Sequence, residues 1–389
     1  MHSGRLVFAQ LMEFLPRHEF NTCVRRFRGD YRVRGFTCRD QFQAMAFAQL
    51  TFRESLRDIT TCLGSLGPKL YHAGFRGHIS RSTLADANER RDWQIYSDFA
   101  QVLIRHARIL YADHELNVDL QNTAYALDST TIDLCLKLFP WASFRRRKAA
   151  VKLHTLLDLR GNIPCFIHVS HGKLHEVEVL DRLIPEPGAF YVMDKAYVDF
   201  ARLHRLTRAA AFFVIRGKKD LDFGRRTYRT VERDTGVRSD QTIVLRGPKS
   251  SKRYPASLRR IVYFDVDLQK RFVFLTNNFA LPALTIARLY KCRWQVELFF
   301  RWIKQHLRIK AFYGNSANAV KTQVWIAVSV FVLVAIVRKE LGLSPSLADV
   351  LQILSVNLFE KTPLLQLFAT PVDPIANYPH PNQLRLFDF

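Results

Sequence analysis

The segment YKCRWQVELFFRWIK, residues 290–304, carries the most informative pattern in the chain. An α-helix advances by about 100° per residue, so Tyr290, Arg293, Glu297 and Lys304 fall on one narrow stripe of such a helix. The segment therefore predicts a helix whose front holds one acid, two cations and a phenol, a set of groups suited to handling phosphate beside a metal ion. The opposite arc is apolar and suited to burial: it carries Leu298, Phe299, Trp302, Ile303 and Leu307.

Two further acids stand next to apolar strand segments. Asp128 lies in the centre of a predicted strand, after AYAL, and Asp194 lies at the end of the strand FYVM. Ligands of α/β proteins bind at strand ends. If Asp128, Asp194 and Glu297 converge, their hard oxygen atoms suit Mg²⁺ or Mn²⁺. Two such ions can hold a phosphodiester for in-line displacement, which makes all three residues candidate catalytic residues and metal ligands.

Taken singly, these acids are weak signals, because a lone Asp in a strand is more often a turn or cap residue. Physical reasoning from the sequence alone does not exclude three neighbouring acids with similar settings: Asp133, Asp158 and Asp199. The stretch HVSHGKLH contains His168, His171 and His175, but their spacing does not match a zinc site.

The composition favours a nucleic-acid partner. The 389 residues carry a formal net charge of +23, and such an excess of cations attracts polyanions. Six scattered cysteines form no CxxC pair, which argues against a zinc ribbon or disulfide scaffold and fits a reducing cytoplasm. The longest uncharged run, Thr322 to Val337, has 16 residues. That is shorter than the roughly 20 residues needed to span a bilayer, so we expect a buried core helix and no membrane association.

Three regions are expected along the chain. Residues 1–90 read as short helices joined by basic turns, which suits a helical DNA-binding domain, although a helical bundle with ordinary surface charge fits the same pattern. Residues 91–340 read as an α/β catalytic domain in which three strands, a helix at 175–184 and a further strand precede a β-rich, basic insertion at about 205–285. Residues 341–389 are expected to form a C-terminal helix and a tail.

At this point the chain resembles bacterial insertion-sequence transposases of the DDE class, in the branch marked by a Tyr-Arg-Glu-Lys signature. Tyr290, Arg293, Glu297 and Lys304 match that signature at every spacing. The segment ALDST resembles the motif of the first Asp, and VMDKAY resembles the motif of the second Asp. Residues 17–63 are similar to the N-terminal domain common in this branch, and the resemblance covers roughly residues 10–340.

The resemblance implies an RNase H-like catalytic core, with a β-rich insertion before the helix that bears Glu297. It implies Mg²⁺ or Mn²⁺, two ions in all, together with double-stranded DNA as transposon ends and target, and a homodimer that synapses two ends. It also implies that Tyr290, Arg293 and Lys304 bind the DNA. The expected protein is a bacterial, cytoplasmic and nucleoid-associated DNA transposase that cuts a mobile element from donor DNA and joins its 3′ ends to target DNA.

Two other functions remain open at this stage. A non-catalytic nucleic-acid-binding protein derived from a transposase needs the charge and the N-terminal helices but not the three carboxylates. A general RNase H-like nuclease needs the carboxylates but no specific DNA end. Cleavage of matched DNA ends in Mg²⁺, in competition with unrelated DNA, separates the three.

Overall fold

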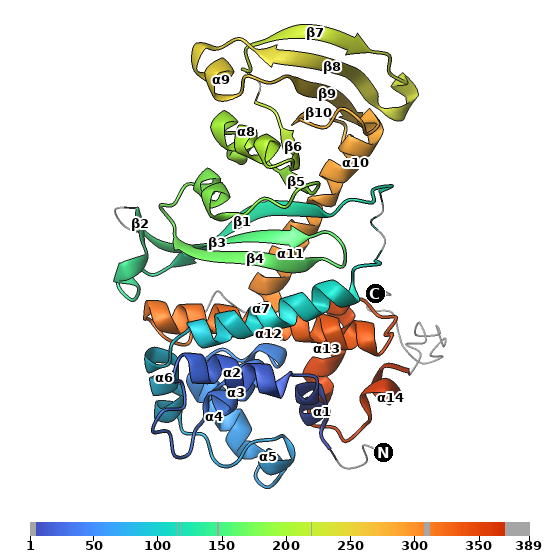
Figure 1. Cartoon of the computed structure of the whole chain (residues 1–389). Helices are drawn as coiled ribbons and strands as arrows, with labels where there is room; N and C mark the ends of the chain where they lie inside the picture. The colour runs from blue at the N-terminus through green and yellow to red at the C-terminus, as the bar shows by residue number, and fades with distance from the viewer. Residues whose placement is uncertain are drawn as a thin grey trace, which may run out of the picture.

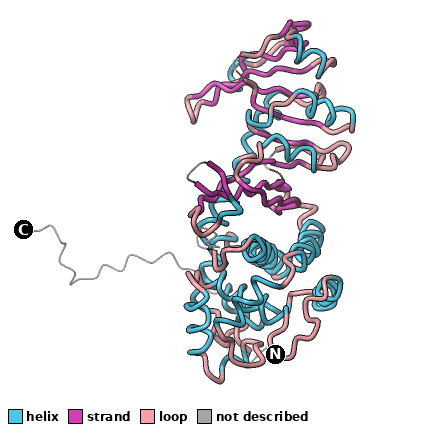
Figure 2. The backbone as a smooth tube through the Cα atoms, turned by 90° about the vertical axis from the view of Figure 1, so that its left-hand side faces the viewer, coloured by secondary structure: helices cyan, strands magenta, loops and turns pink. Residues whose placement is uncertain are grey.

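The protein forms three layers stacked along one axis, with helices at one end, the strands of the core in the middle and a β-rich insertion at the other end (Figure 1). The computed structural model describes residues 5–114, 116, 118–145, 148–218, 220–306 and 312–369. Figure 2 gives the same arrangement from the side, with the strands gathered above and helices seen end-on beneath them.

Helices make up most of the N-terminal and C-terminal parts of the described chain, and α8 and α9 lie among the strands. They are α1 (Val7–Glu13), α2 (Arg17–Arg26), α3 (Cys38–Leu50), α4 (Leu56–Ser65), α5 (Lys69–His72), α6 (Arg81–Arg90), α7 (Gln94–Leu110), α8 (Phe200–Arg208), α9 (Pro248–Arg253), α10 (Ala283–Cys292), α11 (Trp294–His306), α12 (Ala317–Glu340), α13 (Leu347–Asn357) and α14 (Leu364–Ala369).

The strands form one continuous sheet. They are β1 (Ala124–Leu134), β2 (Ser143–Arg145), β3 (Lys148–Asp158), β4 (Ile163–His171), β5 (Phe190–Met193), β6 (Phe212–Arg216), β7 (Phe223–Arg229), β8 (Val237–Leu245), β9 (Leu258–Asp265) and β10 (Lys270–Thr276).

The central strands have the RNase H-like arrangement. Strands β4, β3 and β1 are antiparallel neighbours, and β1, β5 and β6 are parallel neighbours. The chain thus builds a three-stranded meander and then adds two parallel strands to its other edge. Beyond β6 the sheet continues through β10, β9, β8 and β7, all antiparallel. The predicted fold class is confirmed, and the β-rich insertion extends the core sheet rather than folding away from it.

The helical layer is organised around α12. Its side chains from Val324 to Val337 are buried, and it packs mainly against α7 and α3. By length and composition alone α12 is apolar enough to cross a membrane, but 94% of its most apolar window is buried inside the protein, as expected for a core helix. The two ends of the described chain meet here, because the N–H groups of Val7 and Phe8 donate to the carbonyls of Glu360 and Leu358.

Some local expectations were wrong. The helix predicted over 175–184 is present but is a 3-10 helix and shorter, Glu176–Arg182. The helix predicted over 290–304 is split into α10 and α11 by a turn at Arg293, although Arg293 keeps helical dihedral angles. Leu298, expected on the buried arc, is 37% exposed. Leu307 and the tail from residue 370 lie outside the described residues.

Candidate active site

Asp128, Asp194 and Arg216 follow neighbouring positions on the three parallel strands of the core. Leu127 pairs with Met193, and Met193 pairs with Ile215, in the register of β1, β5 and β6. These three apolar side chains are fully buried in one core cluster. Successive side chains of a strand point to opposite faces. The residue after each of them therefore points to the other face of the sheet: Asp128 and Arg216 within their strands, and Asp194 in extended backbone just past the end of β5.

Residues of α10 and α11 meet this row of charged residues. The Tyr290 hydroxyl donates to Asp194 Oδ1 at 3.3 Å. Arg293 donates from Nη1 to Asp128 Oδ2 and from Nη2 to Glu297 Oε1, both at 2.5 Å. The structure thus brings Asp128, Asp194 and Glu297 to one place, with Arg293 and Tyr290 between them. Of the front stripe expected from the sequence, Tyr290 and Arg293 thus contact the two aspartates.

The back of α11 fixes this arrangement. Phe299 and Trp302 pack edge-on against Phe331 of α12, with ring centroids 5.1 and 4.5 Å apart. Ile303 is fully buried beside them. Edge-to-face aromatic contacts stabilise a helix interface beyond the burial of their area. The apolar arc therefore holds Glu297 over the sheet.

Burial and mutual repulsion shape the charge state of the site. Burial raises the pKa of Asp128 to about 6, Arg293 opposes this, and the charges of Glu297 and Asp194 add to it. Burial also raises the pKa of Tyr290 to about 12, which keeps its hydroxyl protonated at neutral pH. Burial alone lowers the pKa of Arg293, but its acidic neighbours outweigh this and raise it. The guanidinium is thus the cation that holds the carboxylates together.

The chemistry of Asp128, Asp194 and Glu297 fits a divalent metal ion, but Arg293 lies between two of these acids. Carboxylate oxygens are the ligands that Mg²⁺ and Mn²⁺ prefer, and a divalent cation removes the repulsion that raises the pKa of Asp128. Within the described ranges no three acidic, histidine or cysteine side chains are arranged to hold a metal ion. Arg293 spans the space between Asp128 and Glu297. The donor set fits, provided that this guanidinium moves aside.

Lys304 lies seven residues after Glu297 on α11, and therefore on the same face of the helix, about 10 Å further along its axis. Its side chain is half-buried. The other acids near the motifs have structural roles or lie at the surface. Asp158 accepts from Arg108 at 3.1 Å, Asp199 caps α8 by accepting from the Arg202 N–H at 3.0 Å, and Asp133 is exposed.

A pocket of about 520 Å³ opens beside Arg293 and Glu297. It lies between α10, α11 and the base of the insertion, and Phe272, Trp294 and Arg216 line it. Trp294 is 49% exposed, and the Arg216 guanidinium lies 5.4 Å from the centre of the Phe272 ring. Sequence reasoning missed Arg216 as a site residue. The signal was present, because Arg216 follows FFVI just as Asp128 follows AYAL and Asp194 follows FYVM.

Comparison with protein families gives two matches. The family described as "Transposase DDE domain" matches residues 120–333, which contain Asp128, Asp194 and the whole 290–304 segment. A domain family of unknown function (DUF4372) matches residues 3–76, in the helical layer. The first match covers the sheet, the insertion, α10, α11 and most of α12.

Individual relatives carry related names. A Sinorhizobium fredii chain named transposase y4zB is 32% identical over 259 residues, which cover 66% of this chain and 71% of that one. A Geobacillus stearothermophilus chain named as the transposase of insertion sequence element IS5377 is 32% identical over 211 residues, 53% of this chain and 54% of that one. Among solved structures, a piggyBac transposase synaptic complex with hairpin DNA is 10% identical, with a TM-score of 0.48, and the match covers 90% of this chain and 79% of that one.

Proposed function

The chain belongs to the family of transposases with a DDE domain, and on that premise we propose that Asp128, Asp194 and Glu297 are its catalytic carboxylates. The protein is a DNA transposase, and DNA is its partner. The observation that supports the assignment is the convergence of these three acids, far apart in the sequence, on the guanidinium of Arg293 and the hydroxyl of Tyr290.

The family generally depends on divalent metal ions. We propose that Asp128, Asp194 and Glu297 hold two Mg²⁺ or Mn²⁺ ions. When bound, such ions lower the pKa of an attacking water or 3′-hydroxyl and stabilise the leaving oxygen. The chain's own contribution is to hold three hard oxygen donors on two rigid strands and one packed helix. Preorganisation of this kind is the main protein contribution to phosphoryl-transfer catalysis.

Arg293, Tyr290 and Lys304 are proposed to bind the DNA strand that reacts. Arg293 has a buried Nε with no partner in the described part of the chain, so its guanidinium retains a donor for a non-bridging phosphate oxygen. Tyr290 is neutral and can donate to a phosphate when it leaves Asp194. Lys304 adds a cation further along the same helix face. Each of these groups can neutralise charge that builds up on phosphate during displacement.

The steps proposed for these residues share one site. Water first cuts the DNA at the end of the element, and this frees a 3′-hydroxyl. That hydroxyl then attacks the phosphodiester of the opposite strand, which forms a hairpin and displaces the 3′-oxygen of the flanking DNA. Water opens the hairpin and frees the 3′-hydroxyl again, and this hydroxyl attacks a phosphodiester of the target DNA and displaces its 3′-oxygen. We further propose that residues 1–90 bind the terminal repeats, that residues 91–340 perform the chemistry, and that two copies act together on two ends. Action on DNA in the bacterial nucleoid follows from the same proposal.

The test is cleavage by the purified protein of a DNA duplex that carries the sequence flanking its own gene. We expect cutting in Mg²⁺ or Mn²⁺ and none in EDTA. Asp128→Ala, Asp194→Ala and Glu297→Ala should each abolish cutting and leave duplex binding intact. Asp133→Ala, at an exposed position on the same strand as Asp128, is the matched control and should cut normally. Full activity of any one of the three variants would remove that residue from the assignment.

A further inference from the structure

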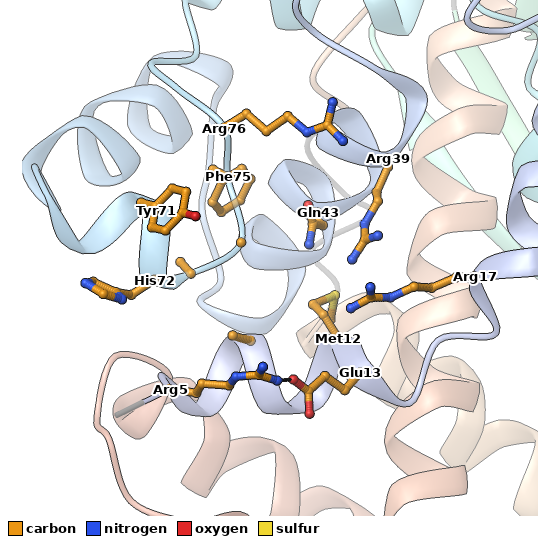
Figure 3. A pocket seen from close by; sticks show the side chains of 13 residues that line it. Arg5, Met12, Glu13, Arg17, Arg39, Gln43, Tyr71, His72, Phe75 and Arg76 are labelled. Atoms are coloured by element: carbon orange, nitrogen blue, oxygen red, sulfur yellow. Dashed lines mark ion pairs between the residues drawn. The ribbon is translucent and has the colours of Figure 1, made fainter. Parts of the chain in front are cut away.

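A second cationic site lies in the helical layer. It is a pocket of about 360 Å³ whose wall comes from the end of α1, the starts of α2 and α3, and the turn after α5. Arg17 and Arg39 come from the first turns of α2 and α3, and Arg76 follows the turn. Figure 3 shows the guanidinium groups of Arg17 and Arg39 close together beside Gln43, with that of Arg76 above them on the same side of the pocket.

The charge in this pocket is not balanced by the protein. The one carboxylate in its wall, Glu13, is paired with Arg5. Arg17, Arg39 and Arg76 make no ion pair or hydrogen bond through their side chains with any residue that the structure describes. Asp40, next to Arg39, accepts from the N–H and hydroxyl of Thr37 in a capping box. Three guanidinium groups therefore repel one another without an anion between them.

Arg39 differs from an ordinary surface cation because it is partly buried, whereas Arg17 and Arg76 are exposed. The pKa of Arg39 is lowered first by that burial and then by the charge of Arg17; the charge of Asp40 partly opposes this, and that of Arg76 adds to it. A guanidinium nevertheless stays protonated at neutral pH. Gathering positive charge at a partly desolvated place costs free energy, and an anion bound there would remove that cost.

The pocket is also preformed. Gly74 adopts a φ of +92°, and a Cβ atom there would lie 3.2 Å from Gln43 Nε2, so the turn requires glycine. The next residue, Phe75, is 2% exposed and stacks on Phe8 with ring centroids 6.0 Å apart. This anchors Arg76 at the rim. Gln43 Oε1 is buried without a partner in the described chain. Little ordering is therefore needed before a ligand binds.

We infer that this pocket binds a phosphate group of duplex DNA, at a place separate from the three carboxylates. The inference rests on the proposed function, which supplies DNA as the partner. Phosphate suits three converging guanidinium groups, because each can donate to a different oxygen. Tyr71 is 77% exposed beside the pocket and can pack against the adjoining sugar or base. A free phosphate or nucleotide offers the same chemistry, and the test separates the two sources.

The test measures the affinity of the full-length protein for a labelled duplex of arbitrary sequence as a function of salt. The variants are Arg17→Gln, Arg39→Gln, Arg76→Gln and the triple substitution. Arg25→Gln is the charge-matched control, since Arg25 is exposed in the same layer and, among the residues that the structure describes, its side chain bonds only to Thr22. Each phosphate contact contributes about 0.9 to the slope of log affinity against log salt. Three arginines on one phosphate should therefore lower the slope by about 0.9 in the triple variant, and their single effects should not add.

Stability provides the second readout. Relief of repulsion should leave the melting temperature of Arg39→Gln unchanged or higher, although DNA affinity falls about tenfold. A purely structural role would lower both. The inference is overturned if the triple variant binds like the control, or if its slope falls by about 2.7, as for three independent surface contacts.

The last comparison separates the anion sources. If inorganic phosphate stabilises the wild type but not the triple variant, and the triple variant binds DNA as tightly as the wild type, the pocket binds a free anion and the DNA assignment is wrong. If the wild type cuts no DNA but its affinity for DNA depends on these arginines, the proposed catalytic function is wrong and the assignment of the pocket as a DNA phosphate site is supported.

Discussion

The substitution Asp128→Asn tests the electrostatics of the candidate site without relying on catalysis. Asp128 has a pKa raised to about 6 from 3.8, mainly by burial. Because its folded pKa lies above the unfolded value, Asp128 contributes most to stability below about pH 4, and this contribution is lost as the pH rises through about 6. At pH 7 the metal-free protein therefore carries an ionised carboxylate that burial disfavours.

The magnitude follows from the same pKa values. A change from 3.8 to about 6 corresponds to about 3 kcal/mol, since one pKa unit is about 1.4 kcal/mol. The Asp128 side chain is still 20% exposed, and water screens part of this cost. We therefore expect Asp128→Asn to stabilise the metal-free protein by about 2 kcal/mol at pH 7. Asparagine is uncharged at every pH, so the gain should vanish near pH 4.

Urea unfolding in EDTA at pH 7 and at pH 4 measures this difference. Asp133→Asn, at the exposed end of the same strand, is the control and should change little at either pH. Added Mg²⁺ should cancel the gain of Asp128→Asn at pH 7, because the cation stabilises only the carboxylate form. An equal gain at both pH values, or a loss at pH 7, would refute the electrostatic argument.

Four further outcomes are expected. Glu297→Gln should abolish cutting of a DNA end while a gel-shift assay still detects the complex; residual cutting at the wild-type rate would contradict its role. Arg293→Met should raise the pKa of Asp128 further in the DNA-free protein, so the lower limb of the pH profile of kcat/KM should move to higher pH, and an unmoved limb would count against the Arg293–Asp128 contact. Arg259→Met breaks a buried ion pair with Asp240, in which the two side chains are 2% and 5% exposed, and should lower the free energy of unfolding by about 3–5 kcal/mol in thermal unfolding. Removal of the more exposed pair of Arg202 and Asp181 should lower it by less than about 1 kcal/mol, and equal losses would contradict this reasoning. Lys304→Ala should lower the salt slope of DNA binding by about 0.9, whereas an unchanged slope would exclude a phosphate contact.

The front of the 290–304 helix could be predicted from the sequence because helical spacing alone fixes which side chains share a face. The same reasoning placed Phe299, Trp302 and Ile303 on the buried side, where they lie. It failed for Leu298, which stands at the edge of the arc, where a small rotation of the helix decides exposure. It also could not foresee the turn at Arg293, which leaves the dihedral angles helical and has no sequence signature such as Gly or Pro.

Contacts between distant segments were beyond sequence reasoning. Periodicity gave Asp128 and Asp194 as strand acids, but only the register of β1, β5 and β6 puts Arg216 in the same row. The fully buried pair of Arg259 and Asp240 joins two strands whose partners no local pattern specifies. The arginine pocket likewise depends on several separate segments of the helical layer. Each of them looks like an ordinary basic turn or helix start in the sequence, so the pocket could not be predicted from any one of them. Spacing predicts faces, whereas tertiary packing decides which faces meet.

The most direct test is anomalous scattering from Mn²⁺ in crystals of the protein bound to a DNA end. Asp128, Asp194 and Glu297 should surround the manganese signal, and the guanidinium of Arg293 should have left Asp128 for the DNA. Manganese bound elsewhere, with Arg293 still spanning Asp128 and Glu297 beside the DNA, would contradict the proposal that these three acids form the metal site.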